Sequence, residues 1–160
     1  MSYTLLCSAT AIEANACRQG IARAGVRAEI LQTGVGYEHA TKSLSEYLAK
    51  NPKPELVIST GFAGALSRDI PLHSWISANR LFKDQRALPG TVLRTAPAFA
   101  RTTGLISTPH LTRQDNLSAA LVTALGTPLA VDMESALLYE VCLARNIPFM
   151  VLRLITDTPD

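Results

Sequence analysis

The feature that most constrains this chain is a pair of apolar segments that each run directly into carboxylates. The segment from Pro148 to Asp157, Pro-Phe-Met-Val-Leu-Arg-Leu-Ile-Thr-Asp, is nearly all apolar, and Ala-Val-Asp-Met-Glu-Ser from Ala130 to Ser135 places two acids around a methionine. A carboxylate is costly to bury unless something neutralises or uses it. Ligands of open α/β sheets bind at the carboxyl ends of the strands. The two segments therefore predict a pocket where strands end.

Strand-like and helix-like patterns alternate along the chain, which predicts an α/β sheet with helices on both faces. The predicted strands are Tyr3–Leu6, Arg27–Gln32, Glu55–Ser59, Leu72–Ala78, Gly104–Ser107, Leu129–Val131 and Phe149–Ile155. The predicted helices are Ile12–Ala24, Glu38–Lys50, Asp115–Leu125 and Glu134–Arg145. We expect Gly61 and Gly64 to end the third strand. The stretch Phe82–Arg101 has no clear period and is interpreted as a loop.

Length and charge exclude several classes of function. The 160 residues correspond to a single domain over residues 1–160, and 48% hydrophobic with 18% charged residues fits a soluble globular enzyme. The net charge of +2 comes from scattered basic residues, so neither nucleic acid nor a membrane is an expected partner. The three cysteines and three histidines lack metal-ligand spacing. No signal peptide is evident, and we expect a cytoplasmic protein with reduced thiols and no metal or cofactor.

Four motifs, in the same order, resemble those of the purine nucleoside phosphorylase and nucleosidase superfamily. They are Thr-Gly-Val-Gly at 33–36, Ile-Ser-Thr-Gly-Phe-Ala-Gly-Ala-Leu at 58–66, Val-Asp-Met-Glu-Ser-Ala at 131–136 and Arg-Leu-Ile-Thr-Asp at 153–157. The resemblance is closest to the hydrolytic branch, which includes methylthioadenosine/S-adenosylhomocysteine nucleosidase and futalosine hydrolase. It implies a mixed, largely parallel central sheet flanked by helices on both faces, contracted in the middle and at the C-terminus.

The resemblance also implies an activity. It predicts hydrolysis of the N-glycosidic bond of a purine-type nucleoside without a cofactor, by a homodimer or larger homo-oligomer. Asp157 matches the aspartate that protonates the departing base, and its apolar surroundings would favour the protonated form. Glu134 matches the carboxylate that binds the ribose hydroxyls, with Met133 packed against the sugar. The alternative for Asp157 is a turn or capping residue; for Glu134 it is an acid in the first turn of a helix, with Asp132 as its N-cap.

Glu13 resembles the glutamate that activates water in the hydrolases, in a region where the phosphorylases bind phosphate through glycine and arginine. Its alternative is a solvent-facing residue near a helix start. Phe62 stands where many relatives have a serine that holds phosphate, which also argues for water as the nucleophile; it otherwise narrows the pocket or packs in the core. Ala63 and Gly64 belong to the glycine segment, which lets the backbone approach the ligand.

His110, in Ser-Thr-Pro-His-Leu from 107 to 111, resembles part of the loop that contacts the base, and an exposed loop histidine is an equal alternative. Arg153 is interpreted as a structural partner of a buried acid such as Asp132. Two other functions stay open: a phosphate-dependent nucleoside phosphorylase, and a nucleoside-binding or scaffold protein that has lost turnover. The sequence does not identify the group at the ribose 5′ position.

Overall fold

The structure, a computed structural model, describes residues 2–96, 98–109, 123–126 and 129–159. Its strands are β1 (Thr4–Ser8), β2 (Ala28–Gln32), β3 (Leu56–Ala65), β4 (Trp75–Lys83), β5 (Arg86–Ala87), β6 (Leu93–Arg94), β7 (Arg101–Ser107), β8 (Leu129–Asp132) and β9 (Phe149–Asp157). The described helices are α1 (Ala11–Ala24), α2 (Tyr37–Lys50) and α4 (Ser135–Ala144). The predicted α/β class is confirmed. No helix among the described residues is long and apolar enough to cross a membrane.

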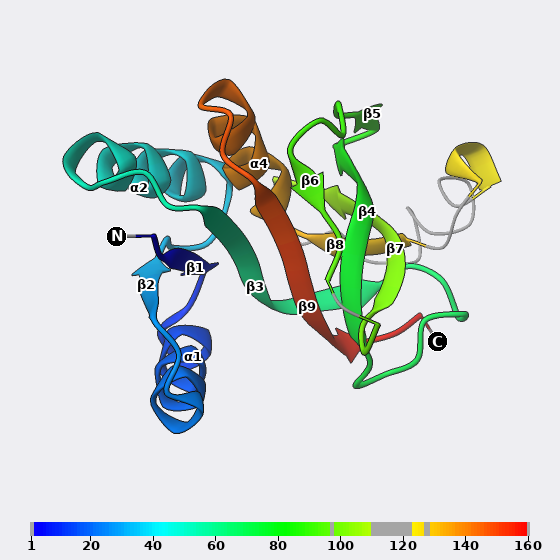
Figure 1. Cartoon of the computed structure of the whole chain (residues 1–160). Helices are drawn as coiled ribbons and strands as arrows, with labels where there is room; N and C mark the ends of the chain where they lie inside the picture. Colours follow the sequence, from blue (N-terminus) through cyan, green and yellow to red (C-terminus); the bar gives the residue numbers. More distant parts are fainter. Residues whose placement is uncertain (1, 97, 110–122, 127–128, 160) are drawn as a thin grey trace.

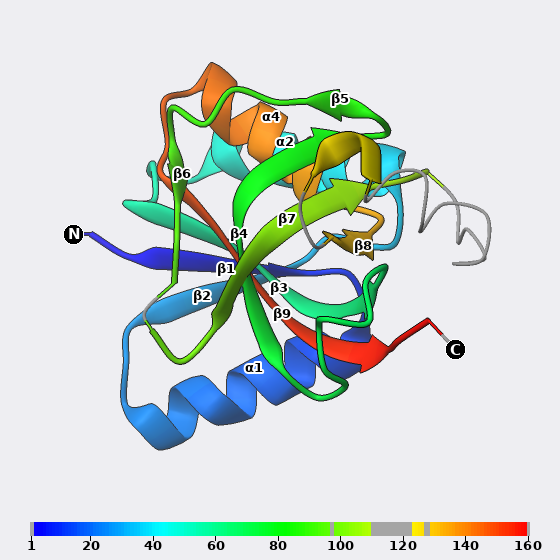
Figure 2. The ribbon, with the colours of Figure 1, turned by 90° about the vertical axis from the view of Figure 1, so that its right-hand side faces the viewer.

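The first third of the chain is a parallel strand and helix repeat. Strand β1 pairs in parallel with both β2 and β3, and helices α1 and α2 make the connections. Helix α1 begins at Thr10, whose side chain accepts the amide of Glu13, and it ends at Gly25 with φ of 63°. A left-handed residue after a helix favours glycine. Figures 1 and 2 show α1 on one side of these strands, with α2 and α4 on the other.

The remaining strands close on themselves instead of extending an open sheet. β3 pairs with β8, β8 with β7, β7 with β4, β4 with β9, and β9 with β3 again. The β3–β8 and β4–β9 pairings are antiparallel, whereas β8–β7, β7–β4 and β9–β3 are parallel. The pattern of predicted strands does not reveal this ring, because closure depends on pairings between residues distant in sequence. Figure 1 shows the ring strands at the end of the molecule away from β2.

Strand β3 is twice as long as predicted because its glycines bend the strand without ending it. The expected end at Ser59 is wrong, since β3 continues to Ala65. Gly61 has φ of 135°, and the register against β9 shifts between Ala63 and Gly64. A glycine and a register irregularity are ordinary causes of a strand bend. The bend lets β3 pair with β9 first and with β8 near its end.

The middle of the chain contains more strand than predicted. The loop expected at Phe82–Arg101 is wrong, because it holds the end of β4, both short strands β5 and β6, and the first residue of β7. The strand predicted at Leu72–Ala78 begins later and extends further, as β4. Most of the helix predicted at Asp115–Leu125 lies outside the described residues; residues 123–125 are helical.

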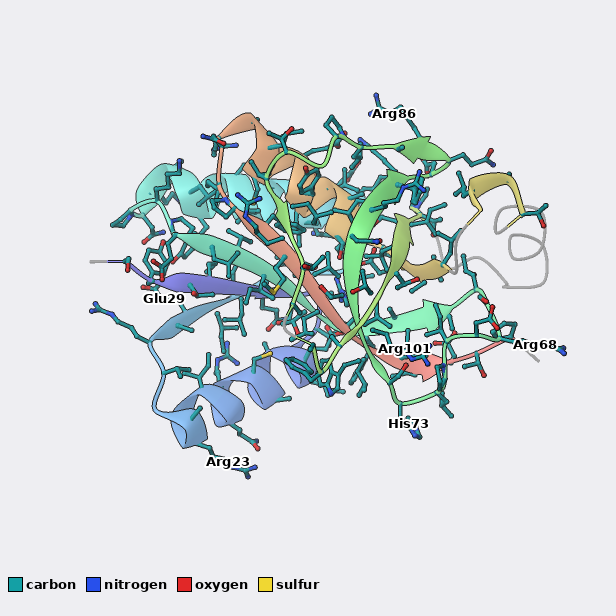
Figure 3. All side chains as sticks on the ribbon, turned by 45° about the vertical axis from the view of Figure 1, so that its right-hand side comes forward. Arg23, Glu29, Arg68, His73, Arg86 and Arg101 are labelled. Atoms are coloured by element: carbon teal, nitrogen blue, oxygen red, sulfur yellow. The ribbon has the colours of Figure 1, made fainter. Side chains whose placement is uncertain are left out.

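The main hydrophobic core lies between the strands and the helices α2 and α4. Leu5, Val57 and Val151, from neighbouring strands β1, β3 and β9, are fully buried there with Leu44 of α2 and Leu138 of α4. Several arginine side chains lie outside this core. Figure 3 shows Arg23, Arg68 and Arg86 pointing away from the body of the protein in different directions. Their scatter agrees with the expectation drawn from composition.

Candidate active site

Strands β1, β3, β8 and β9 all end around one cavity of about 240 Å³. It is lined by Ala9, Thr10, Glu13, Val35, Phe62, Ala63, Gly64, Thr108, Val131, Asp132, Met133, Glu134, Arg153, Thr156 and Asp157. The pocket predicted at the carboxyl ends of strands is therefore present. Seven of the eight predicted site residues line it: Glu13, Phe62, Ala63, Gly64, Met133, Glu134 and Asp157. The eighth, His110, lies outside the described residues.

Glu13 is buried in the first turn of α1 and its carboxylate bridges two elements. Oε2 accepts hydrogen bonds from the amide and the hydroxyl of Thr10, each at 2.9 Å, which forms a capping box. Oε1 accepts the amide of Phe62 at 2.9 Å. The side chain is 6% exposed, so the solvent-facing alternative is wrong. Helix capping and contact with β3 hold this carboxylate at the cavity wall.

Gly61 creates the space that the Glu13 carboxylate occupies. A Cβ atom at this position would lie 2.2 Å from Oε1 of Glu13 and 2.9 Å from Nη1 of Arg153. The φ of 135° also belongs to the region that favours glycine. The missing side chain at Gly61 thus permits the close approach of two charged side chains.

Arg153 forms the floor of the cavity and is 1% exposed. Its Nη2 donates to Ser59 Oγ at 2.8 Å and to Ser135 Oγ at 3.2 Å, and lies 2.8 Å from Asp132 Oδ2. The predicted pair with Asp132 is confirmed. Nη1 donates to the carbonyl of Phe62 at 3.4 Å, whereas Nε has no partner among the described residues. A buried guanidinium needs such partners, because an unpaired buried charge is strongly destabilising.

Asp132 is the most heavily hydrogen-bonded acid of the site. Its Oδ1 accepts the hydroxyl of Ser107 at 2.5 Å, and its Oδ2 accepts both the hydroxyl and, at 3.1 Å, the amide of Ser135. The predicted N-cap at Asp132 is wrong, because residue 134 occupies the N-cap position of α4, although Asp132 accepts the first amide of the helix. Three hydrogen-bond donors and Arg153 together hold this carboxylate in place.

Glu134 lies beside this pair and is 5% exposed. Its Oε1 accepts the amide of Gly36, at the start of α2, at 3.0 Å, and its Oε2 lies 3.7 Å from Nη2 of Arg153. Burial and the neighbouring negative charge of Asp132 raise the pKa of Glu134, while Arg153 and the Gly36 amide act in the opposite direction. The carboxylate faces the cavity and can accept hydrogen bonds from hydroxyl groups of a ligand.

The opposite side of the cavity is open. Phe62 is 45% exposed and Val35 is 49% exposed, so packing of Phe62 in the core is excluded. Asp157 ends β9 with an exposed side chain, and its Oδ1 accepts the hydroxyl of Thr156 at 3.2 Å. The apolar surroundings predicted for Asp157 are therefore wrong, because β9 carries its last two residues past the core. The alternative of a turn residue is wrong as well.

Sequence reasoning missed the hydroxyl and backbone groups that hold the acids. Thr10 had a readable signal, since a threonine three residues before a glutamate is the sequence of a capping box. Ser59, Ser107 and Ser135 had none. They come from β3, β7 and the start of α4, and only the fold brings them to Asp132 and Arg153.

The charges of the described lining residues set what the cavity can bind. Glu13, Asp132, Glu134 and Asp157 are acidic, and Arg153 is basic and already paired with Asp132. Because most of these groups are acidic, the cavity favours a ligand on which positive charge develops and disfavours a negatively charged ligand. Carboxylates on opposite walls can also serve as a proton donor and a proton acceptor.

Known proteins are similar to this chain in sequence or in fold. No family model matches the sequence. A 5′-methylthioadenosine/S-adenosylhomocysteine nucleosidase from Glaesserella parasuis is 28% identical over 157 aligned residues, covering 82% of this chain and 68% of the relative. The nucleosidase of the same description from Colwellia psychrerythraea, solved with adenine, has a TM-score of 0.80 at 16% identity over 98% of this chain and 83% of that one. Futalosine hydrolase of Helicobacter pylori has a TM-score of 0.77 at 17% identity over 98% of this chain and 84% of that one.

Fold and cavity together define an α/β protein that has the fold of this nucleosidase and an acidic site at its strand ends. The chain is therefore similar in sequence to a nucleosidase, and it shares its fold with nucleosidases and with futalosine hydrolase.

Proposed function

We propose that the protein hydrolyses the N-glycosidic bond of a purine-type nucleoside. The observation that carries this proposal is the convergence of Glu13, Met133, Glu134 and Asp157 on one cavity, although they come from three separate parts of the chain. The purine-type base is proposed because relatives are named for methylthioadenosine and S-adenosylhomocysteine, and one related structure holds adenine.

Asp157 is proposed to donate a proton to the base as the bond between the sugar carbon and the base nitrogen breaks. The electron pair of that bond leaves with the base, and positive charge develops on the sugar ring. Glu134 accepts hydrogen bonds from the sugar hydroxyls and stabilises this charge, with Met133 against the ring. Glu13 takes a proton from water while the water oxygen bonds to the sugar carbon.

The surroundings of Glu13 support its proposed part. Its carboxylate accepts three N–H and O–H groups, which fix its position at the cavity wall, as a proton acceptor requires. The same surroundings argue against phosphate as the nucleophile. Of the described lining residues, the one cation is already engaged by Asp132, and a phosphate would meet the Glu13 carboxylate.

The experiment is a panel of purine nucleosides assayed for free base with and without phosphate. We expect release of base without phosphate, and Glu13→Gln to lower kcat by about 10²–10⁴-fold, the usual contribution of general base catalysis. Strict dependence on phosphate would favour the phosphorylase instead. Binding of nucleosides without release of base would favour the scaffold.

We further propose that the protein works in the cytoplasm as a homodimer or larger homo-oligomer. The three cysteines are free thiols, and Cys7 and Cys142 are buried. Val35 and Phe62 leave apolar surface at the cavity mouth, and Ile12 of α1 is 74% exposed. Exposed apolar surface of this kind is typical of an interface. A monomer by light scattering that retains full activity would argue against the oligomer.

A further inference from the structure

The two acids beside Arg153 are not equivalent partners of its guanidinium. Nη2 lies 2.8 Å from Asp132 Oδ2 and 3.7 Å from Glu134 Oε2. The first distance is that of a charge-assisted hydrogen bond, and the second is beyond hydrogen-bond reach. Nη2 carries two hydrogens, and its other contacts at hydrogen-bond distance are the hydroxyls of Ser59 and Ser135. Nη2 therefore donates to the two serine hydroxyls and forms a close ion pair with Asp132, whereas Glu134 is attracted only from a longer distance.

The groups around Asp132 keep the Arg153 guanidinium closer to Asp132 than to Glu134. Ser107 and Ser135 donate their hydroxyls to its two oxygens, and the Ser135 amide donates to Oδ2. Ser135 also lies 2.8 Å from Ser59, oxygen to oxygen, so one polar cluster holds both the acid and the guanidinium. All five side chains of the cluster (Ser59, Ser107, Asp132, Ser135 and Arg153) are at least nine-tenths buried, which leaves the guanidinium little freedom to turn.

We propose that Asp132 is a positioning residue that holds Arg153 away from Glu134 and so leaves one Glu134 oxygen for the hydroxyl groups of a bound sugar. Oε1 of Glu134 is engaged by the Gly36 amide, and the contact of Oε2 with the described residues is the long approach of Arg153. The part concerning the sugar rests on the proposed function. The division of Arg153 between the two acids does not.

The ionisation of Glu134 reports this division directly. The groups that face it are Asp132 from β8, Arg153 from β9, Glu13 from α1 and the Gly36 amide at the start of α2, with Asp157 on the wall of the same cavity. Replacing Asp132 by asparagine removes a neighbouring negative charge and releases Arg153 toward Glu134. Both changes favour the ionised form of Glu134, so its pKa falls.

The experiment is a ¹³C NMR titration of the glutamate side-chain carboxyls in the free protein, with Glu134 assigned by its loss in Glu134→Gln. We expect Glu134 of the parent to titrate above the ordinary range of a glutamate, and Asp132→Asn to lower its midpoint by about one pH unit or more. Asp69→Asn is the matched control. It removes the same charge from an exposed residue that does not line the cavity, and should leave the midpoint unchanged.

A second readout concerns the sugar. In Asp132→Asn we expect KM for a hydrolysed nucleoside to rise more than kcat falls, because Arg153 then occupies the oxygen that the hydroxyls use. A midpoint that stays in place in folded Asp132→Asn overturns the proposal. If that variant does not fold, the parent decides, since a midpoint at or below the ordinary glutamate range means that Arg153 already neutralises Glu134. Absence of nucleoside hydrolysis in the parent overturns the proposed function instead, and the titration is unaffected.

Discussion

The floor and the mouth of the cavity are built in opposite ways. On the floor, Arg153 and Asp132 are buried and joined to each other and to three serine hydroxyls. At the mouth, Phe62, Val35 and Asp157 are exposed. A buried network of this many hydrogen bonds is rigid, and its charges need no rearrangement when a ligand arrives. The floor is therefore fixed in the free chain, whereas the mouth is open to water.

The difference assigns separate tasks to the two regions under the proposed function. Charge that develops on a sugar is stabilised best by groups that are already fixed, and Glu134 lies on the floor with one oxygen oriented by the Gly36 amide. The proton donor for the base, Asp157, stands at the mouth, where a bound base would itself exclude water from the carboxyl group. Substitutions on the floor should thus change folding, and those at the mouth should change turnover.

The largest effect is expected from removing the centre of the floor. Arg153→Met leaves Asp132 buried without its counter-ion, and we expect the free energy of unfolding to fall by about 3–5 kcal/mol. Urea denaturation measures it. The control is Arg86→Met, whose guanidinium is 73% exposed and 3.4 Å from Glu140, and which should cost less than about 1 kcal/mol. Equal effects of the two substitutions would mean that the floor is not a rigid network.

At the mouth the expectation is reversed. Asp157→Asn should lower kcat by about 10²–10⁴-fold because the amide cannot donate the proton. The same variant should unfold within about 0.5 kcal/mol of the parent, since the side chain is exposed. Steady-state kinetics and urea denaturation on one preparation measure both. An Asp157→Asn protein that hydrolyses every tested nucleoside like the parent would leave Asp157 as an ordinary residue at the end of β9.

The sequence predicts these two regions unequally. The positions of Glu13, Glu134 and Asp157 follow from short motifs, because apolar strands and helix starts are local patterns. The strand ring does not, since β3 meets β8 and β9 through residues about 70 to 90 positions away. The serines of the floor cannot be predicted from the sequence either, because hydrogen bonds between distant elements leave no periodic signal. The burial of Asp157 was predicted wrongly because an apolar run predicts a buried strand and not where that strand leaves the core.

An intermediate effect is expected where floor and mouth meet. Gly61→Ala places a Cβ against the Glu13 carboxylate and keeps an unfavourable φ, so we expect a loss of about 1–3 kcal/mol with displacement of Glu13. The matched control is Gly20→Ala. A Cβ at Gly20, inside α1, meets no heavy atom of the described structure within 4 Å and should stabilise the protein by about 0.5–1 kcal/mol. Thermal denaturation of both variants distinguishes the steric clash at Gly61 from the general effect of replacing glycine by alanine. A Gly61→Ala protein as stable as the parent would show that β3 can bend without this glycine.

The smallest expected effect is on the melting temperature, and it tests whether the buried Glu134 carboxylate destabilises the folded protein. Burial and the charge of Asp132 raise the pKa of Glu134 above its ordinary value. The folded state therefore holds this proton more tightly than the unfolded state does, and the stability that protonation contributes is lost as the pH rises through the folded pKa.

Glutamine keeps the shape of the side chain and cannot ionise. Glu134→Gln should consequently melt higher than the parent at neutral pH, by at most about 2–4 °C, with the difference shrinking as the pH falls toward the ordinary glutamate range. Glu46→Gln, on the exposed face of α2, should show no such pH dependence. If the parent instead gains stability over Glu134→Gln as the pH rises, Arg153 stabilises Glu134 more than burial destabilises it, and Asp132 cannot be holding the guanidinium apart.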